Sequence, residues 1–236
     1  MKESQPYNLY NTASSANYYK YRNPSLHSFY TSNPFSNLCH ASPRNSRKQS
    51  PARLRIFHSA ETTDKFHVYI DGVPISKTLP YKEENQYRFI PPGKHQITLC
   101  SSGDINETIL KKEITLAPNR YYTLVTTANA QDTGMIAFED QPTVPVGEAK
   151  VRFLNLSSEA REIDIAVKNR DVIFSNIHSG NGTTYLGITP MSLELEARKT
   201  GTKEVVLHLP LLRFEPNTAY TVLILENDVI LLPEYL

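Results

Sequence analysis

The sequence contains no tryptophan and only two cysteines, Cys39 and Cys100. Two cysteines, one in a polar N-terminal stretch and one at the end of a strand-like run, do not define a disulfide framework, and we expect both thiols to stay reduced. The lack of tryptophan and of a cysteine pair also excludes the core of antibody domains. A β-sandwich needs neither feature.

Long apolar runs are also missing. No run approaches the ~20 residues that span a bilayer, and the N-terminus lacks the apolar segment of a signal peptide. We therefore expect neither Sec-type export nor a transmembrane segment. The expected location is the cytoplasm, or a spore or cell-surface layer that is assembled without a signal peptide.

The motifs of common enzymes are absent as well. The sequence has no G-x-S-x-G elbow, no H-E-x-x-H, no P-loop and no C-x-x-C. The glycines of SGNGTTY, residues 179 to 185, precede no helical pattern, so this stretch is predicted to be a loop between strands rather than a phosphate site. We expect no enzymatic activity, no cofactor and no metal site.

The charge is distributed unevenly along the chain. The net charge is +1 overall, but residues 1 to 50 carry six Lys and Arg side chains against Glu3 alone, which leaves the tail at about +5 and the remainder at about −4. Ser, Asn and Tyr fill 23 of these 50 positions. A segment with so few apolar residues cannot offset the entropy of ordering, so residues 1–51 are predicted to be a disordered basic tail that mediates association. Specific nucleic-acid binding is not expected, because the folded remainder is mildly acidic.

From Arg53 onward, apolar residues alternate with polar ones, as in half-buried strands. RLRIFH and FHVYID show this period of two, and Asp71-Gly72 between such runs is a hairpin signal. No stretch of about 12 residues holds a helical period with caps. The fold class is therefore predicted to be all-β.

The second half of the chain repeats the first. APNRYYTLV at 117 to 125 returns as EPNTAYTVL at 215 to 223, and ARLRIF and FHVYID recur 97 residues later as AKVRFL and IDIAVK. Ile97 and Leu99 are matched with Leu193 and Leu195. About seven short strands per copy indicate two tandem immunoglobulin-like β-sandwich domains, at 52–140 and 149–236, joined by a proline-rich linker.

The first copy resembles the bacterial domain-of-unknown-function family 4397. The resemblance is carried by RLRIFH, the VYIDG stretch at 68 to 72, LPY at 79 to 81, QYRFIPPGKHQITL and ITLAPNRYYTLV, and covers residues 53 to about 138. The second copy, 150 to 230, resembles the family less. Lys82 replaces a glycine of the family, and Asn155 stands where the first copy has His58. The resemblance implies a small β-sandwich module, often in tandem and often in bacterial surface or envelope proteins, with no established activity.

Four residues of the first copy are candidates for contact with a partner or ligand: His58, His67, Tyr81 and Tyr87. If the first two strands paired antiparallel, His58 and His67 would approach each other near Asp64, as a metal or acid–base cluster requires. The alternative is that a single histidine at a strand end is structural, and the second copy has no matching histidines.

The expected function is a non-enzymatic binding or structural module, a component of a bacterial surface or spore layer that is recruited through its tail. Its partner would be a protein or a cell-surface polymer. The alternative is a carbohydrate-binding module of the cell envelope, because aromatic side chains on a sandwich can stack on sugars. Solvent-facing tyrosines would favour this alternative, whereas burial of Tyr122 and Tyr220 in the two cores would weaken it.

Overall fold

The computed structural model describes residues 49–60, 65–103, 107–129 and 132–234. Residues 1–48 of the predicted tail, and Asp64, therefore lie outside the described residues. The strands, in chain order, are β1 (Ala52–His58), β2 (Lys65–Ile70), β3 (Val73–Pro80), β4 (Arg88–Ile90), β5 (Gly93–Ser101), β6 (Thr108–Leu116), β7 (Tyr121–Asn129), β8 (Asp132–Asp140), β9 (Ala149–Asn155), β10 (Glu162–Val167), β11 (Val172–His178), β12 (Leu186–Ile188), β13 (Met191–Leu193), β14 (Leu195–Lys199), β15 (Val205–His208), β16 (Leu212–Phe214), β17 (Thr218–Ile224) and β18 (Val229–Glu234).

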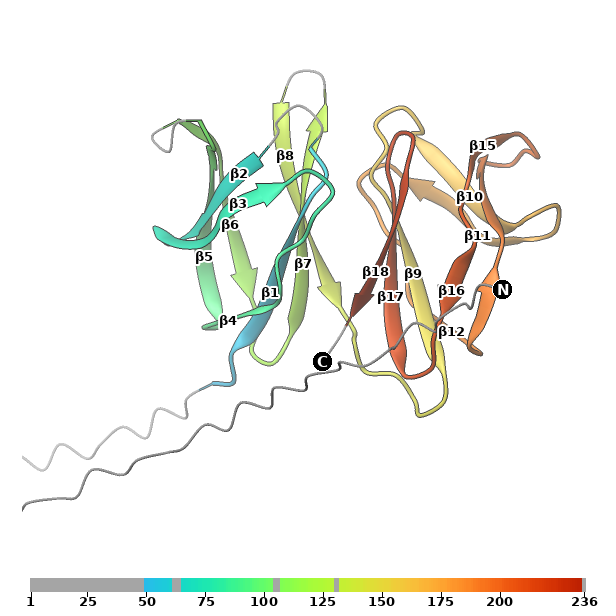
Figure 1. The fold of residues 1–236 in the computed structure, drawn as a ribbon, viewed down its shortest axis with the longest axis horizontal. Coiled ribbons are helices and arrows are strands. Elements are labelled where there is room, and N and C mark those ends of the chain that lie inside the picture. Colours follow the sequence, from blue (N-terminus) through green and yellow to red (C-terminus); the bar gives the residue numbers. More distant parts are fainter. Residues whose placement is uncertain (1–48, 61–64, 104–106, 130–131, 235–236) are drawn as a thin grey trace, which may run out of the picture. The chain divides into compact units, whose positions relative to one another are not determined.

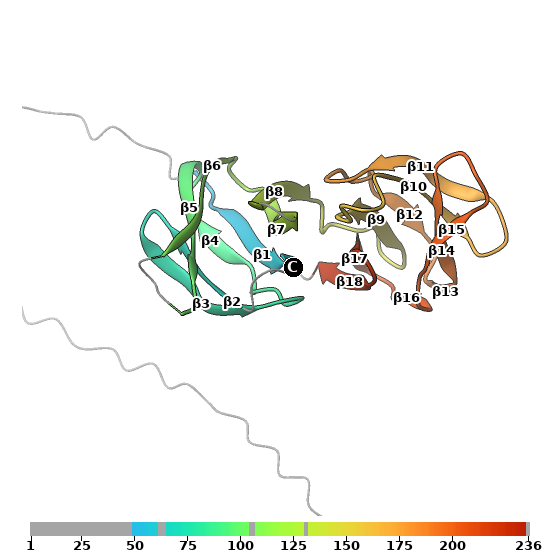
Figure 2. The same cartoon turned by 90° about the horizontal axis from the view of Figure 1, so that it is seen from above.

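The strands form two sets that do not exchange partners. In the first set, the sheets β4-β1-β7-β8 and β3-β2-β5-β6 enclose one core; in the second, β12-β9-β17-β18 and β11-β10-β14-β15 enclose another, with β13 paired to β16 at its border. Figures 1 and 2 show the two sheets of each set facing each other. We refer to β1–β8 as the first domain and β9–β18 as the second. The predicted all-β tandem of sandwiches is confirmed.

The described residues form strands, turns and bends, and none of them lies in a helix. Accordingly, this part of the chain has no helix that could cross a membrane.

Strand register shows how the two domains correspond, and it corrects the predicted matches of Ile97 and Leu99. Ile97 pairs with Ile70 in the first domain, and Leu195 pairs with Val167 in the second. Because Ile70 and Val167 are themselves equivalent, Ile97 corresponds to Leu195 rather than to Leu193. The difference arises because β5 is continuous, whereas its counterpart in the second domain is divided into β13 and β14.

The two cores follow from the alternating pattern of the sequence. Inward-facing residues of the central strands, such as Leu54, Ile56 and Val68, have no exposed surface. Their counterparts Val151, Phe153 and Ile165 are at most 3% exposed. Burying one such side chain contributes about 1.5–3 kcal/mol.

The repeated Pro-Asn-x-x-Tyr-Thr motif forms the turn into β7 and into β17. Asn119 and Asn217 have positive φ angles of 57° and 61°, which asparagine tolerates better than most residues. Three residues later, the hydroxyl of Tyr122 accepts a hydrogen bond from the amide of Ala117 (3.2 Å), and that of Tyr220 accepts one from Glu215 (2.9 Å). The prediction that these tyrosines occupy equivalent places is confirmed. Tyr220 is buried in its core (5% exposed) and Tyr122 packs partly buried against the other core, so neither of these two tyrosines supports the carbohydrate-binding alternative.

Candidate functional site

His58 and Tyr81 lie together at one end of the first core. The His58 ring is buried against Phe66, with ring centroids 4.2 Å apart, and Tyr81 meets it edge-on at 5.9 Å. The two ring nitrogens lie 3.0 Å from the carbonyl oxygens of Leu79 and Ala60. Burial lowers the pKa of His58, so the ring is neutral at pH 7.

Asn155 is the counterpart of His58 in structure as well as in sequence. Its side-chain nitrogen donates to the carbonyl oxygens of Ile177 (3.0 Å) and Ala160 (2.8 Å). Both side chains therefore join the end of the first strand of their domain to the same parts of the fold. This geometry gives His58 a structural task, while ligand contact by His58 stays a prediction.

The other two candidate residues lie elsewhere in the first domain. His67 alternates with the buried Phe66 and Val68 along β2, so it lies on the outer face of its sheet and away from the core that holds His58. Tyr87 donates its hydroxyl to Asp140 at 2.7 Å. The four predicted contact residues thus do not form one site. In the described part of the chain, no group of three His, Cys, Asp or Glu side chains could hold a metal ion.

Sequence analysis missed a buried polar network between the two domains. Arg55 donates through Nε to Thr123 (2.8 Å) and through Nη1 to the carbonyl of Pro233 in the second domain (3.1 Å). Arg152 repeats this arrangement with Thr221 (2.8 Å) and with the carbonyl of Glu139 in the first domain (2.7 Å). Each domain therefore extends one arginine to the last strand of the other.

Carboxylates complete both halves of this network. Asp140 accepts hydrogen bonds from Thr123 and Tyr87, and Arg152 forms an ion pair with it. Glu234 likewise accepts from Thr221 at 2.6 Å and from Tyr185 at 2.5 Å.

The phenols of this network are held in their protonated form. Burial, with the nearby carboxylates, raises the pKa of Tyr87 and of Tyr185 far above the ordinary value. Both tyrosines therefore act as hydrogen-bond donors inside the protein. Ligand contact by Tyr87 stays a prediction.

An apolar cluster lies beside the network and contains residues of both domains. Phe57 and Val125 come from β1 and β7 of the first domain, and Leu154 and Leu223 are their counterparts in β9 and β17. All four are fully buried. Each central sheet is thus covered on its outer face as well as on its core face. A repeated signal existed in the sequence, because Arg55, Tyr87 and Thr123 all recur in the second copy.

A row of aromatic and basic side chains, which we call the aromatic platform, crosses β4, β1 and β7 of the first domain; one of its members is exposed and the other two are partly buried. It consists of Phe89, Arg53 and Tyr121, which are direct neighbours in the strand register. The Arg53 guanidinium lies 5.0 Å from the centre of the Phe89 ring and 4.6 Å from that of Tyr121. Phe89 is 67% exposed, which is unusual for a side chain of this size and makes the row accessible.

The second domain has no such platform. Gly187, Lys150 and Ala219 occupy the corresponding positions of β12, β9 and β17. Because the two domains share their cores and their turns, the platform is a property of the first domain rather than a requirement of the fold.

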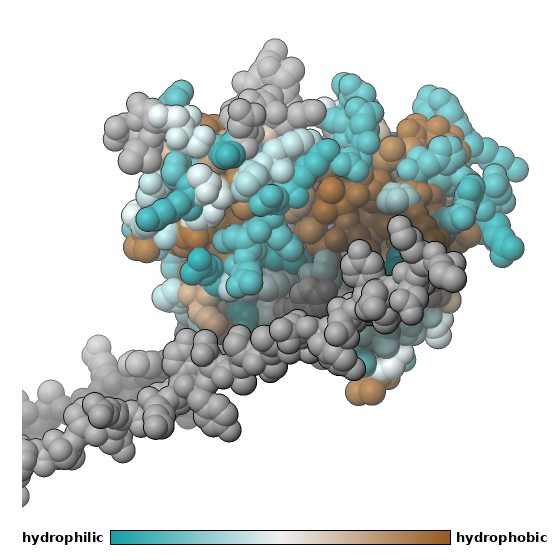
Figure 3. Space-filling view, in the orientation of Figure 1, coloured by the Kyte–Doolittle hydropathy of each residue, from teal (hydrophilic) through white to brown (hydrophobic). Residues whose placement is uncertain are grey.

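The second domain carries a hollow of about 240 Å³ at the end of its core, with both apolar and polar side chains around it. Ile163, Leu207 and Ile224 contribute to its wall. The β17–β18 hairpin turns soon after Ile224, whereas β7 and β8 continue further, so the shorter hairpin covers less of the core. Figure 3 shows the apolar surface beside β17 and β18.

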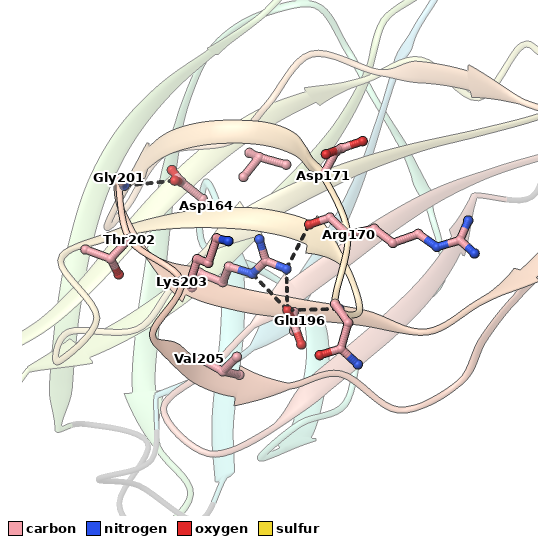
Figure 4. A pocket seen from close by; sticks show the side chains of 11 residues that line it. Asp164, Arg170, Asp171, Glu196, Gly201, Thr202, Lys203 and Val205 are labelled. Carbon is pink, nitrogen blue, oxygen red and sulfur yellow. Dashed lines mark hydrogen bonds and ion pairs between the residues drawn. The ribbon is translucent and has the colours of Figure 1, made fainter.

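A larger, polar hollow of about 740 Å³ lies over β10 and β14 (Figure 4). We call it the polar hollow. Three charged residues that are at most 7% exposed, Asp164, Glu196 and Arg198, form its floor. Arg198 donates to Glu196 from Nε at 2.8 Å and from Nη2 at 2.5 Å. His67, Thr98 and Cys100 occupy the corresponding positions in the first domain, so this charged floor is found in the second domain alone.

Comparisons with known proteins give a family for part of the chain and distant likenesses in structure. No curated protein matches the sequence. A family 26 carbohydrate-binding module of Eubacterium rectale Amy13K, solved with maltoheptaose, is 9% identical over 78% of this chain and 98% of its own, with a TM-score of 0.26. A streptococcal virulence factor described for α-glucan binding is 14% identical over 76% and 95%, with a TM-score of 0.26.

A cell adhesion protein of Bacteroides ovatus, so described in its structure, is 9% identical over 80% of this chain and 97% of its own, with a TM-score of 0.22. At such scores these likenesses support no conclusion about the ligand. No catalytic family is identified. The family comparison matches residues 52–166, which include the whole first domain and the first two strands of the second. Residues 52–166 of this chain are therefore a domain of the family DUF4397, a domain of unknown function.

Proposed function

We propose that the protein is a non-catalytic carbohydrate-binding module whose ligand contact is the aromatic platform of the first domain. The observation that carries the proposal is the exposure of Phe89 in one row with Arg53 and Tyr121. A sugar ring has an apolar face of C–H groups that packs on an aromatic ring, and a neighbouring guanidinium donates hydrogen bonds to its hydroxyl groups.

The platform suits a polymer better than a small molecule. It is a flat row on the face of a sheet rather than an enclosed pocket, and small ligands are usually bound in clefts that bury most of their surface. The expected ligand is therefore a polysaccharide.

The test is retardation of the full chain in gels that contain soluble polysaccharides of neutral, acidic and amino-sugar types. We expect Phe89→Ala to weaken the binding of the retarding polymer about fivefold, since an aromatic contact contributes on the order of 1 kcal/mol. Val73→Ala is the matched control, because Val73 is an apolar residue of the same domain with 63% exposure. Equal retardation of Phe89→Ala and wild type, or retardation by none of the polymers, would contradict the proposal.

A structural component recruited through the tail is the second candidate function. The buried contacts between the domains favour it, because they hold the two domains in a fixed arrangement, as a structural component requires. Pull-down with the full chain and with a chain that lacks residues 1–51 separates the two candidates. Capture that depends on the tail, and persists in Phe89→Ala, would favour the scaffold over the carbohydrate-binding module.

A further inference from the structure

The polar hollow of the second domain has a floor that is only partly used by the protein. Asp164 accepts from the amides of Asn176 (2.7 Å) and Gly201 (3.0 Å), which engages both of its oxygens. Glu196 uses Oε1 for the two bonds from Arg198 and for the amide of Asn169 (3.3 Å). Its Oε2 has no hydrogen bond from any described residue.

Arg198 has a similar unused group. Its Nε and Nη2 are engaged by Glu196, and Nη2 also donates to the carbonyl of Arg170 at 2.9 Å. No hydrogen bond of Nη1 joins it to the described part of the chain. The hydrogen bonds from Arg198 lower the pKa of Glu196, which keeps this carboxylate charged. The floor therefore offers one carboxylate oxygen and one guanidinium nitrogen that the described residues leave without a hydrogen bond.

The charges around the hollow cancel. Three acids, Asp164, Asp171 and Glu196, stand against three bases, Arg170, Arg198 and Lys203. An anionic ligand would meet the two carboxylates of the floor, and a cationic ligand would meet Arg198 and Lys203. A neutral ligand avoids the like-charge repulsion that either kind of charged ligand would meet.

We propose that the polar hollow binds a neutral, hydroxyl-rich ligand, namely a sugar unit or another polyol. A hydroxyl group both donates and accepts hydrogen bonds, so two adjacent hydroxyls can engage Glu196 Oε2 and Arg198 Nη1 together. Lys203 also borders this hollow, and its ammonium can donate to a third hydroxyl.

This site is separate from the aromatic platform, and the two proposals can fail independently. Phe89 lies in the first domain, whereas every residue around the hollow lies in the second. The polar hollow contains no aromatic side chain among its lining residues. We therefore expect hydrogen bonds to dominate binding there and stacking to dominate at the platform.

The test is a titration of the ¹⁵N-labelled full chain with glucose, galactose, mannose and N-acetylglucosamine, followed by amide chemical shifts. Glucuronate and inorganic phosphate are the charged probes. We expect at least one neutral sugar to shift the amides of Asn169 and Gly201, which border the floor. A larger response of these amides to glucuronate or phosphate, or no response to any neutral sugar, would overturn the proposal.

Variants then assign the shifts to the hollow. Lys203→Ala should weaken binding of the responding sugar about tenfold, as expected for the loss of one hydrogen bond from a charged group. Lys203 is exposed on a turn, so the variant is expected to fold. Lys111→Ala, an exposed lysine of the first domain, is the matched control, and Phe89→Ala should leave these shifts unchanged. Equal affinity of Lys203→Ala and wild type would overturn the proposal.

Discussion

At the scale of single residues, the most informative comparison is between His58 and Asn155. Both connect the end of the first strand to two carbonyl groups, but the amide of Asn155 supplies two N–H donors without charge. A neutral imidazole has one N–H, so His58 can donate to Leu79 or Ala60 but not to both. Protonation would supply the second donor, and burial opposes it.

The first prediction concerns the pH dependence that follows from His58. Its pKa is lower in the folded protein than in the unfolded chain, where it is about 6.5. The unfolded state therefore binds the proton more readily, and the contribution of His58 to stability is present above about pH 6.5 and is lost as the pH falls through the folded pKa.

His58→Asn removes this titration and should reduce the fall in unfolding free energy between about pH 7 and pH 5, by at most about 1.4 kcal/mol per pH unit. Urea unfolding of both proteins across this range provides the measurement. His208→Asn, at an exposed position of the second domain, is the control. An unchanged pH dependence in His58→Asn would show that His58 does not titrate in this way.

At the scale of elements, the Pro-Asn turn fixes where β7 and β17 begin. The amide of Asn119 donates to the carbonyl of Ser50 (3.2 Å), and that of Asn217 to Glu148 (2.6 Å), so each turn holds the residues that precede the first strand of its domain. Asn217 also accepts a hydrogen bond from the amide of Gly147 at 2.8 Å. The second turn thus holds the segment that joins the two domains.

The second prediction compares alanine at these two positions. Asn119→Ala should lower the unfolding free energy by about 1 kcal/mol, because alanine adopts a positive φ at a cost of this size. Asn217→Ala should cost about 1 kcal/mol more, since it also removes the bond from Gly147. Chemical unfolding of both variants measures the difference, with Asn→Gly at each position as the control that keeps the turn conformation. A smaller loss in Asn217→Ala than in Asn119→Ala would contradict this account.

The sequence predicted the elements well where the local pattern determines them. Alternation identified the strands, and Asp71-Gly72, with φ angles of 50° and 78°, forms the predicted hairpin turn. The predicted match of Ile97 was wrong by two residues. The counterpart of β5 is divided into β13 and β14, and the spacing of apolar residues gives no sign of this division. The network around Arg55 and Arg152 was missed for a different reason. An arginine that alternates with core residues has the same pattern whether its face meets water or another domain.

At the scale of the whole molecule, the buried contacts between the domains are nearly the same when viewed from either domain. Arg55 reaches the last strand of the second domain, and Arg152 reaches the last strand of the first. The ion pairs of the two arginines differ in strength. Arg152 forms an ion pair with Asp140, whereas Arg55 Nη2 lies 3.9 Å from Glu234 and has no hydrogen bond in the described structure.

The third prediction is therefore asymmetric. Arg152→Ala leaves the buried carboxylate of Asp140 without its cation, and breaking a buried pair in this way costs about 3–5 kcal/mol. Arg55→Ala should lower the unfolding free energy by less. The ion pair of Arg55 with the buried Glu234 is long, at 3.9 Å, and its closer carboxylate, Glu84 at 3.0 Å, is partly exposed. Since Asp140 belongs to the first domain and Arg152 to the second, the loss should also weaken the coupling between them.

Differential scanning calorimetry measures both effects. We expect wild type to unfold in one transition, because the shared apolar cluster and the polar network join the two cores. Arg152→Ala should separate this transition into two. Lys150→Ala is the control. Lys150 lies two residues from Arg152 on the same face of β9, and it forms no ion pair with the described residues. A single transition in Arg152→Ala, displaced no further than in Lys150→Ala, would mean that the apolar cluster alone couples the domains.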